Sequence, residues 1–598
     1  MKLVFDIETD DLDAKNIWCI VAKDILSDQL YTYGPTQIEE GCQLLAEADE
    51  LIGHNIIGFD LPVLRDLTRF KTLGHGQSIV DTLVLSRLFD PVREAGHGLA
   101  TWGYKLGSKK IEFKSFAEGF TNEMLEYCIQ DVELNVLVYK ALREESRGFS
   151  RDSVELEHEV ANILKEQERH GFLYDAMASD LLLAELRETV AKTEATVKRV
   201  FKPKITKTKL YPKITKSGSL SKMANLCRSG VGKGVRMTRA EHELMTKKLE
   251  KADYNVEACD PVIRSRSQDF NLSSRQQVGE YLQDFGWKPT EFTAHGRPIV
   301  NEKTLAEVKG IKEADLIKSY LMYQKRVSQI NSWNESVEED GRVHGFVIPN
   351  GAITGRMTHR NPNMAQVPSS NSPYGSQCRA VWSVPEGYKL VGIDASGLEL
   401  RMLSHYMDDE DYTNEVINGD IHTANQNLAG LESRSQAKTF IYALLYGAGD
   451  EKLGSVAGGG RSVGTRLRQS FFDNLPAFKT LKNRVGSASE RGYLKGLDGR
   501  KLYVRSEHAA LNTLLQGAGA VVMKQALVLF NREIKKERLD AHFVANVHDE
   551  WQLEVADKDA ERVGELGVAA IIAAGEHLDL KCPLDGEYNV GNNWSETH

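Results

Sequence analysis

Acidic residues form two separate groups along this chain, and each group has the composition of a site for divalent metal ions. The first group consists of Asp6, Glu8, Asp60 and Asp131, and the second of Asp394, Asp549 and Glu550. Mg²⁺ is a hard cation that prefers oxygen ligands such as carboxylates and substrate phosphates. Because a pair of such ions stabilises both the attacking and the leaving oxygen of an in-line displacement at phosphorus, the two groups predict two phosphoryl-transfer reactions in one polypeptide.

The first acidic group is carried by a predicted strand, a loop and a predicted helix. In VFDIET, Asp6 and Glu8 are two residues apart, so both side chains project from one face of a strand. HNIIGFD supplies Asp60, and YCIQD supplies Tyr127 and Asp131, four residues apart on one helical face. An Asp-x-Glu pair alone is commonly a solvated strand edge. All three segments together, in this order, indicate a metal site.

The second acidic group is placed by strand ends. KLVGIDASGLELR is an apolar strand that ends at Asp394 and turns into a helix beginning near Glu399, where free backbone amides favour a polyphosphate. FVANVHDEWQLEV has the pattern of a hairpin with His548, Asp549 and Glu550 at its turn. An ordinary polar turn is the alternative. A functional hairpin would bring Asp549 to Asp394 across a sheet.

Between these segments, RSQAKTFIYALLYGAG predicts a helix with an unusual face. Arg434, Lys438 and Tyr442 recur every four residues, which gives one face with two cations and an aromatic ring. Such a face can hold a triphosphate by charge-assisted bonds. A generic amphipathic helix is the alternative, but the apolar residues between them already supply a buried side and leave the cationic face unexplained.

The first group resembles the Exo I, Exo II and Exo III motifs of the DEDDy proofreading exonucleases, which have a ribonuclease H-like fold. The resemblance implies that Asp6, Glu8, Asp60 and Asp131 bind the metals and that Tyr127 orients the attacking water. It further implies a 3′→5′ exonuclease.

The downstream segments resemble motifs A, B and C of the family A DNA polymerases. The match continues through TGRMTHRNPNMAQVP (354–368), GDIHTAN (419–425), LDGRKLYVRS (497–506) and HAALNTLLQGAGA (508–520). GIDASGLELR, AKTFIY and LYGAGDEK are almost unchanged from the replicative polymerases of the T-seven type of podophage. The likeness covers essentially the whole chain and implies a DNA-directed DNA polymerase that replicates phage DNA.

This resemblance assigns roles to individual residues. Asp394, Asp549 and the backbone carbonyl of Ala395 would be the metal ligands of polymerisation, with Glu550 beside them in the catalytic set. Each active site would hold two Mg²⁺ ions, with Mn²⁺ as a substitute. The residues assigned to the incoming dNTP are His422, Arg434, Lys438 (also a proton donor to pyrophosphate), Tyr442, Glu399 (excluding ribonucleotides) and Tyr446 (near the template base). Those assigned to the minor groove of the primer–template are Arg356, His508, Asn512 and Gln516.

Tyr442 carries a separate expectation. Many bacterial relatives carry Phe at this position, whereas the T-seven type carries Tyr. The resemblance therefore implies that the Tyr442 hydroxyl replaces the missing 3′-OH of a dideoxynucleotide, so that terminators are used nearly as well as dNTPs.

Composition limits the setting of the protein. The chain has 598 residues, of which 41% are hydrophobic and 27% charged, as expected of several globular domains. It has no uncharged apolar run of about 18 residues, and MKLVFDIETD has an acidic, strand-like pattern, so we expect neither a transmembrane helix nor a signal peptide. Seven scattered cysteines without a CxxC pair indicate a reducing compartment. We expect the host bacterial cytoplasm.

A basic segment stands out from the net charge of −10. Between Lys198 and Lys248 the sequence has fifteen Lys or Arg against two Glu. The segment could contact a phosphate backbone, dock an acidic partner, or form a solvated loop. Residues 202–268 correspond in position to the thumb insertion that binds host thioredoxin in the T-seven type, although the segment is shorter and diverged. The sequence is compatible with two roles for this segment: it binds host thioredoxin as a processivity factor, or it contacts DNA without a partner.

The predicted fold class is α+β and multidomain, with a ribonuclease H-like α/β domain followed by a right-hand polymerase domain. The expected boundaries are 1–145 for the exonuclease, 153–335 for the thumb with its 202–268 insertion, 340–405 and 511–598 for the palm, and 406–510 for the fingers. The expected partners are primer–template DNA, dNTPs, and a phage helicase–primase and single-strand binding protein, with no membrane.

Two other functions are alternatives to this one. The chain could be an exonuclease whose second half only binds DNA, but Asp394, Lys438 and Asp549 are intact. It could be a single-subunit RNA polymerase, but Glu399 as a sugar gate and the attached exonuclease both argue against that.

Overall fold

A computed structural model describes the chain from Met1 to His598 except residues 72–75, 109, 112, 218, 220–235 and 253–261. The chain divides into two compact units, one formed by Met1–Ser179 with Ser332–His598 and the other by Asp180–Asn331. Both acidic groups lie in the first unit. The expected insertion at 202–268 lies in the second, and its residues 218, 220–235 and 253–261 are outside the described part.

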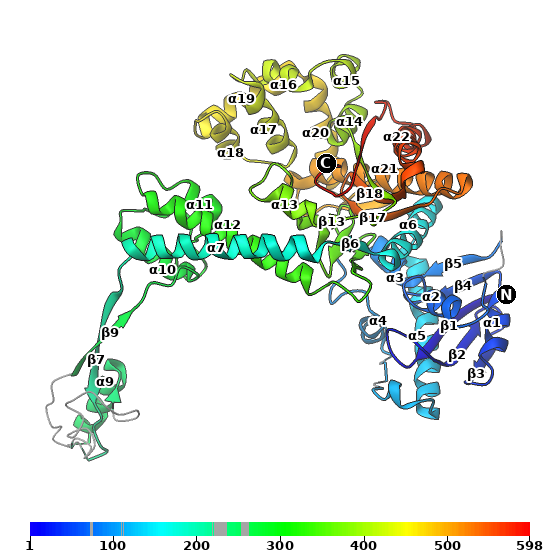
Figure 1. The fold of residues 1–598 in the computed structure, drawn as a ribbon, viewed down its shortest axis with the longest axis horizontal. Coiled ribbons are helices and arrows are strands. Elements are labelled where there is room, and N and C mark those ends of the chain that lie inside the picture. The colour runs from blue at the N-terminus through cyan, green and yellow to red at the C-terminus, as the bar shows by residue number, and fades with distance from the viewer. Residues whose placement is uncertain (72–75, 109, 112, 218, 220–235, 253–261) are drawn as a thin grey trace. The chain divides into compact units, whose positions relative to one another are not determined.

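The first unit begins with a five-stranded mixed sheet (Figure 1). In spatial order its strands are β3 (Leu30–Tyr33), β2 (Ile17–Asp24), β1 (Lys2–Thr9), β4 (Glu50–Gly53) and β5 (Ser78–Asp81). The β1–β2 and β2–β3 pairs are antiparallel, whereas β1–β4 and β4–β5 are parallel. This is the mixed topology expected for a ribonuclease H-like domain.

Alternation along β1 decides which side chains reach the first candidate site. Leu3, Phe5 and Ile7 pack against α1 (Ile38–Ala46) and α2 (Asp60–Leu67) on one face of the sheet. Val4 packs on the opposite face against the buried side of α5 (Asn122–Glu145). Asp6 and Glu8 have the parity of Val4, so they project toward α5. The rest of this region comprises α3 (Thr82–Phe89), α4 (Leu99–Leu106) and η1 (Phe116–Glu118).

Helix α6 (Arg151–His170) joins this sheet to the rest of the first unit through neighbouring residues. The Nε2 atom of His158 accepts a hydrogen bond from the Asp81 N–H at 2.8 Å. The adjacent Glu157 is fully buried and pairs with Arg500 at 2.7 Å and with Lys524 at 2.5 Å. An unpaired buried charge is strongly destabilising, so these ion pairs favour the position of α6 in which Glu157 reaches both partners.

The second half of the first unit is built on an antiparallel sheet. Its order is β17 (Ala541–Val547), β18 (Glu550–Ala556), β14 (Tyr388–Ala395) and β19 (Gly586–Gly591). Helices α21 (Glu507–Glu537) and α22 (Ala560–His577) share the hydrophobic core with this sheet. The hairpin predicted in FVANVHDEWQLEV is confirmed as β17 and β18.

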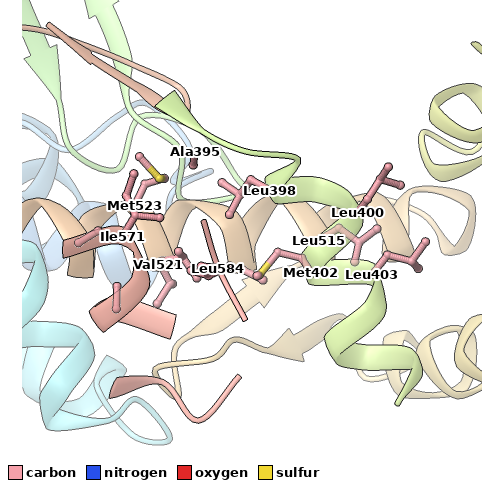
Figure 2. Packing of buried hydrophobic residues seen from close by; sticks show 14 of the residues in the cluster. Ala395, Leu398, Leu400, Met402, Leu403, Leu515, Val521, Met523, Ile571 and Leu584 are labelled. Atoms are coloured by element: carbon pink, nitrogen blue, oxygen red, sulfur yellow. The ribbon is translucent and has the colours of Figure 1, made fainter. Parts of the chain in front are cut away.

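Helix α14 (Leu398–Met407) follows β14 and packs on the long helix α21 (Figure 2). Leu398, Met402 and Leu515 are buried at this contact. A Cβ atom at Gly519 would lie 3.2 Å from Leu398, so the absence of a side chain there allows the close approach. The packing fixes the start of α14, and therefore Glu399, next to the end of β14.

A helical layer follows α14. It comprises α15 (Glu410–Asn418), α16 (Ile421–Ala429), α17 (Arg434–Leu445), α18 (Asp450–Val456), α19 (Arg461–Asn474), α20 (Pro476–Ser489) and the hairpin β15 (Tyr493–Lys495) and β16 (Lys501–Tyr503). The shorter elements of the unit are β6 (Phe172–Tyr174), β10 (Arg342–Val343), β11 (Phe346–Ile348), β12 (Thr358–Arg360), η3 (Met364–Gln366), α13 (Gly375–Ala380), β13 (Trp382–Ser383) and η4 (Asp557–Asp559).

Helix α21 is long and apolar enough to cross a membrane by composition alone. In the fold, 83% of its most apolar window is buried inside the protein, as in the central helix of a globular core.

The second unit consists of helices and a β-ribbon. In chain order its elements are α7 (Ala176–Val200), which begins at the unit boundary, β7 (Lys204–Pro212), β8 (Arg236–Met237), α9 (Arg239–Glu250), β9 (Val262–Gln268), α10 (Arg275–Asp284), α11 (Glu302–Ala306) and α12 (Lys312–Asn334), which ends in the first unit. Strands β7 and β9 pair antiparallel, and Phe201, Phe270 and Tyr281 pack together at the base of the ribbon. The described part of the insertion is therefore a ribbon with a capped helix.

Candidate active sites

The four carboxylates of the first acidic group converge between β1, α2 and α5. Asp60 is the first residue of α2, and its carboxylate accepts a hydrogen bond from the Ile7 N–H at 3.2 Å. Burial, reinforced by Asp60 and Glu8, raises the pKa of Asp6 well above its usual range. Burial also raises the pKa of Glu8 to about 9 and that of Asp60 to about 7, and it raises the pKa of Asp131. Buried carboxyl groups that lie so close together can all be ionised only if a positive charge is added between them.

This first group fits divalent cations by its donor set. Ligand atoms of Asp6, Glu8 and Cys128 lie within 4.8 Å of one another. Among the described residues, the Oδ1 atom of Asp131 is buried without a hydrogen-bond partner. The Cys128 thiol was not anticipated from the sequence. Burial raises its pKa well above its usual range, so it remains a neutral thiol and leaves the carboxylates as the hard ligands.

Tyr127 lies beside these carboxylates and is held by aromatic neighbours. Its ring centroid is 5.9 Å from that of Phe113 and 5.8 Å from that of Phe116. The Lys110 ammonium lies 4.7 Å from the centroid of the Tyr127 ring and also forms an ion pair with Asp131. No sequence pattern marks Lys110 as part of the site. It precedes η1 in a stretch without helical or strand periodicity.

Strand pairing brings the second acidic group together. In the β14–β18 pair Asp394 is opposite Glu550, and the Ala395 N–H donates to the Asp549 carbonyl at 3.1 Å. Ala395 is the last residue of β14, next to Asp394. Burial, reinforced by Asp549 and Glu550, raises the pKa of Asp394 to about 7. The hairpin turn therefore places Asp549 beside Asp394, as the sequence predicts.

Glu550 is engaged differently from its neighbour Asp549. Its carboxylate accepts hydrogen bonds from Trp594 Nε1 at 2.5 Å and from Gln552 Nε2 at 2.7 Å. His598 Nδ1 lies 3.1 Å from the same carboxylate, and Arg379 lies 3.5 Å away. Burial alone would raise the pKa of Glu550, but His598 and Arg379 outweigh it and hold that pKa below its usual range. This carboxylate anchors the chain after β19 to the hairpin.

The cationic face predicted on α17 lies beside α16. The Arg434 Nε atom pairs with Asp420, the N-cap residue of α16, at 2.7 Å. His422, in the first turn of α16, has its pKa lowered by partial burial and then by Arg434 and Lys438. Its ring centroid is 6.4 Å from that of Tyr442. Two elements therefore contribute to one basic surface.

Comparison with known proteins decides the family. A sequence model of DNA polymerase family A matches residues 240–596. The chain is 34% identical, over 710 aligned positions covering all of both chains, to the DNA-directed DNA polymerase of Enterobacteria phage T3, and equally to that of Escherichia phage T7. The chain belongs to DNA polymerase family A. It is a DNA-directed DNA polymerase, as its full-length phage relatives are.

The fold agrees with this family. A solved structure of the POL domain of Pol1 from M. smegmatis, in complex with DNA primer–template and dNTP, aligns with a TM-score of 0.76 at 18% identity. The alignment covers 100% of this chain and 95% of that one, and at this identity it shows a shared fold. The predicted α+β multidomain class is confirmed. Family A DNA polymerases generally depend on divalent metal ions, and they act on primer–template DNA with dNTPs.

In this polymerase Glu399 is held by two neighbours. The Tyr446 hydroxyl donates to its carboxylate at 2.9 Å, and Arg356 donates to it at 3.3 Å. Glu399 lies in the first turn of α14, one turn after the end of β14. The proposed sugar gate, template-base residue and minor-groove arginine thus form one hydrogen-bonded group, a connection that their sequence positions did not reveal.

The other predicted minor-groove residues follow one face of α21. His508 is exposed, and Asn512 and Gln516 are half-buried, at successive four-residue steps. A cavity of about 320 Å³ beside His508 is also lined by Gly447, Arg468 and other residues of α17 to α21. Polar side chains at these steps can follow a groove for about two helical turns.

Removal of divalent metal should make the stability of the folded polymerase fall as the pH rises. In the unfolded chain these carboxyls ionise near pH 4, whereas in the folded polymerase burial raises the pKa of Asp60 and of Asp394 to about 7. Without metal, stability is therefore lost as pH rises from about 4 through 7. Mg²⁺ binds the ionised groups and should restore it, so its stabilising effect should be larger near pH 8 than near pH 6.

Thermal unfolding in EDTA and in Mg²⁺ at these two pH values measures the effect. We expect a difference of several degrees in the first transition, and a reduced pH dependence in the Asp60→Asn/Asp394→Asn variant. An equal stabilisation by Mg²⁺ at both pH values in the wild type would contradict the prediction.

Proposed function

We propose that this polymerase extends a DNA primer through Asp394, Asp549 and the Ala395 carbonyl, which would hold two Mg²⁺ ions, with Mn²⁺ as a substitute. When bound, the ions lower the pKa of the primer 3′-hydroxyl and neutralise the pyrophosphate. The observation that carries the proposal is the pairing of β14 with the β17–β18 turn, which places Asp549 beside a buried Asp394. Glu550 supports this pair by anchoring the chain after β19 to the same hairpin.

The cationic face of α17 would bind the triphosphate. Arg434, Lys438 and His422 present positive charge or hydrogen-bond donors from two adjacent helices, and charge-assisted bonds to phosphate are the strong ones. Lys438 is exposed, so it can approach the leaving group and donate a proton to pyrophosphate.

The sugar and the bases would be read by the group around Glu399. The Glu399 carboxylate, fixed by Tyr446 and Arg356, would crowd the sugar 2′ position and exclude ribonucleotides. Tyr446 would stack near the template base. Arg356, with His508, Asn512 and Gln516 of α21, would contact the minor groove, whose degenerate acceptor pattern allows pair geometry to be checked regardless of sequence.

The first acidic group would form a second active site, a 3′→5′ exonuclease for proofreading. Asp6, Glu8, Asp60 and Asp131 would hold its metal ions, and Tyr127 would orient the attacking water. Three features support this: mutual elevation of the pKa values of the carboxyls, an unpartnered buried oxygen of Asp131, and the adjacent phenol. We therefore propose the same boundaries that the sequence predicts for the exonuclease, thumb, palm and fingers.

A primer–template assay tests both activities together. With dNTPs the primer should lengthen, with rNTPs it should not, and without nucleotides its 3′ end should shorten. Extension with rNTPs would favour an RNA polymerase, and shortening without any extension would favour an exonuclease on a DNA-binding platform.

The second unit would supply processivity. Its β7–β9 ribbon and α9 carry Lys and Arg along the part of 202–268 that the structure describes. We propose that this segment docks host thioredoxin, and that the polymerase works in the host bacterial cytoplasm with a phage helicase–primase and single-strand binding protein.

Processivity on a long primed template, with and without host thioredoxin, tests the docking. Products of one binding event should lengthen several-fold when thioredoxin is present, and a variant lacking 202–268 should not respond. If the wild-type products had the same length with and without thioredoxin, the docking proposal would be wrong, and the basic segment would contact DNA without a partner.

A further inference from the structure

Lys110 is placed inside the first acidic group by three contacts. Its side chain is 26% exposed, and its ammonium forms an ion pair with the Asp131 carboxylate. The same ammonium lies 4.7 Å from the centroid of the Tyr127 ring and hydrogen-bonds the Tyr127 side chain. Tyr127 in turn hydrogen-bonds Asp131, so the three groups form a closed set.

The direction of these hydrogen bonds follows from the chemistry of the groups. An ammonium has three donors and no acceptor, so the phenolic oxygen of Tyr127 accepts from Lys110. The hydroxyl hydrogen of Tyr127 must then point to another acceptor, here the Asp131 carboxylate. Phe113 and Phe116 hold the ring of Tyr127 in place, but they cannot orient its hydroxyl.

The position of Lys110 also matters for charge. Its ammonium acts favourably on the ionised forms of Asp6, Glu8 and Asp131. The additional bond to the phenol and its place over the ring indicate that Lys110 acts through Tyr127 as well.

We propose that Lys110 is a positioning residue of the exonuclease site, where it fixes the hydroxyl of Tyr127 in the orientation that aligns the attacking water. The inference rests on the proposed exonuclease function. Removal of the ammonium leaves Asp131 as the one hydrogen-bond partner assigned to the hydroxyl, so the hydroxyl and the water beside it are held less firmly. The rate of the bound complex should therefore fall, whereas affinity for the DNA end should change little.

A double-mutant cycle of Lys110→Met and Tyr127→Phe tests the proposal. Lys110→Met keeps the length of the side chain without its charge, and it should lower the exonuclease kcat by roughly 10- to 100-fold with little change in KM. If Lys110 acts through Tyr127, the double variant should be no slower than the slower single variant. Losses that multiply in the double variant, or an unchanged rate in Lys110→Met, would overturn the proposal.

Three further measurements separate a positioning role from damage to the site. Lys110→Arg should recover part of the rate, because a cation with donors is restored. Primer extension by Lys110→Met should equal that of the wild type, since Lys110 is outside the polymerase site. Mn²⁺ binding to the DNA-free protein, measured by electron paramagnetic resonance, should not weaken in Lys110→Met, whereas a collapsed site would bind Mn²⁺ less tightly and would overturn the proposal. A wild-type protein without any 3′→5′ degradation would instead refute the exonuclease function itself.

Discussion

The Asp549→Ala variant should lose primer extension while it continues to shorten a primer from its 3′ end. Asp549 is in the turn between β17 and β18, and the Ala395 N–H donates to its backbone carbonyl, which places it at the end of β14 beside Asp394. Loss of one of the two carboxylates proposed to hold the metal pair should lower the extension rate by at least roughly a thousandfold. Because the backbone contact to Ala395 is unaffected by the substitution, the hairpin should keep its register.

The reciprocal variant carries Asp6→Ala with Glu8→Ala. It should extend primers at the wild-type rate and lose 3′→5′ degradation by a comparable factor, because both residues belong to the group between β1 and α5. Exposed acids elsewhere in the same two regions serve as matched controls, namely Asp557→Ala at the far end of β18 and Asp13→Ala after β1. Quench-flow kinetics on one end-labelled primer–template measure both rates. Loss of both activities in either variant would mean that the acidic groups are not independent sites.

Residues next to strand ends were the most predictable part of the sites. The position of Asp394 follows from an apolar run that must become a buried strand, and that of Asp549 from a polar turn between two such runs. Residues on one helical face, such as Tyr127 and Asp131, follow from a four-residue spacing. In each case one local element determines where the side chain projects, so the sequence suffices.

The partners of Glu550 could not be inferred from its position next to Asp549 in the sequence. Its position beside Asp549 suggests a shared task, yet Glu550 is the first residue of β18, where neighbouring side chains alternate between faces. Gln552, two residues further, has the same parity and donates to it. Its partners Trp594 and His598 come from the end of the chain, and no spacing rule connects them to the hairpin.

Lys110 and the ribbon of the second unit were missed for different reasons. Lys110 reaches Asp131 through tertiary folding alone, so no periodic pattern marks it. In the ribbon, Pro and Gly residues and the dense charge of 202–268 suggested an irregular insertion. Within KITKTKLYP, the stretch TKTKL (206–210) nevertheless alternates β-branched or apolar residues with lysines, and the structure pairs this segment with VIRSRSQ. This alternation indicates a strand, but the many charged residues around it favoured an irregular loop.

The Tyr442→Phe variant should discriminate against dideoxynucleotides far more strongly than the wild type. Tyr442 lies on the cationic face of α17, and burial, then Glu399 and Asp549, raise the pKa of its hydroxyl. The hydroxyl is therefore near both the proposed sugar gate and a proposed metal ligand. In the part of the chain that the structure describes, it has no hydrogen-bond partner, so it is free to take the place of the missing 3′-OH of a terminator.

The size of this effect follows from the cost of an unmet hydrogen bond in a closed site. A dNTP brings its own 3′-hydroxyl and should be incorporated by Tyr442→Phe at nearly the wild-type rate. A dideoxynucleotide has no such group, and without the phenol its incorporation should fall by roughly 100-fold or more. The ratio of dideoxy to deoxy incorporation, taken from kcat/KM in single-nucleotide extension, measures the change. Tyr446→Phe is the matched control, because it removes a phenol that bonds Glu399 and lies one helical turn further along the chain, and it should leave the ratio close to that of the wild type. If the ratio were the same in Tyr442→Phe and the wild type, the hydroxyl would not stand in for the sugar, and the terminator would have to be accepted through contacts to its base and phosphates alone.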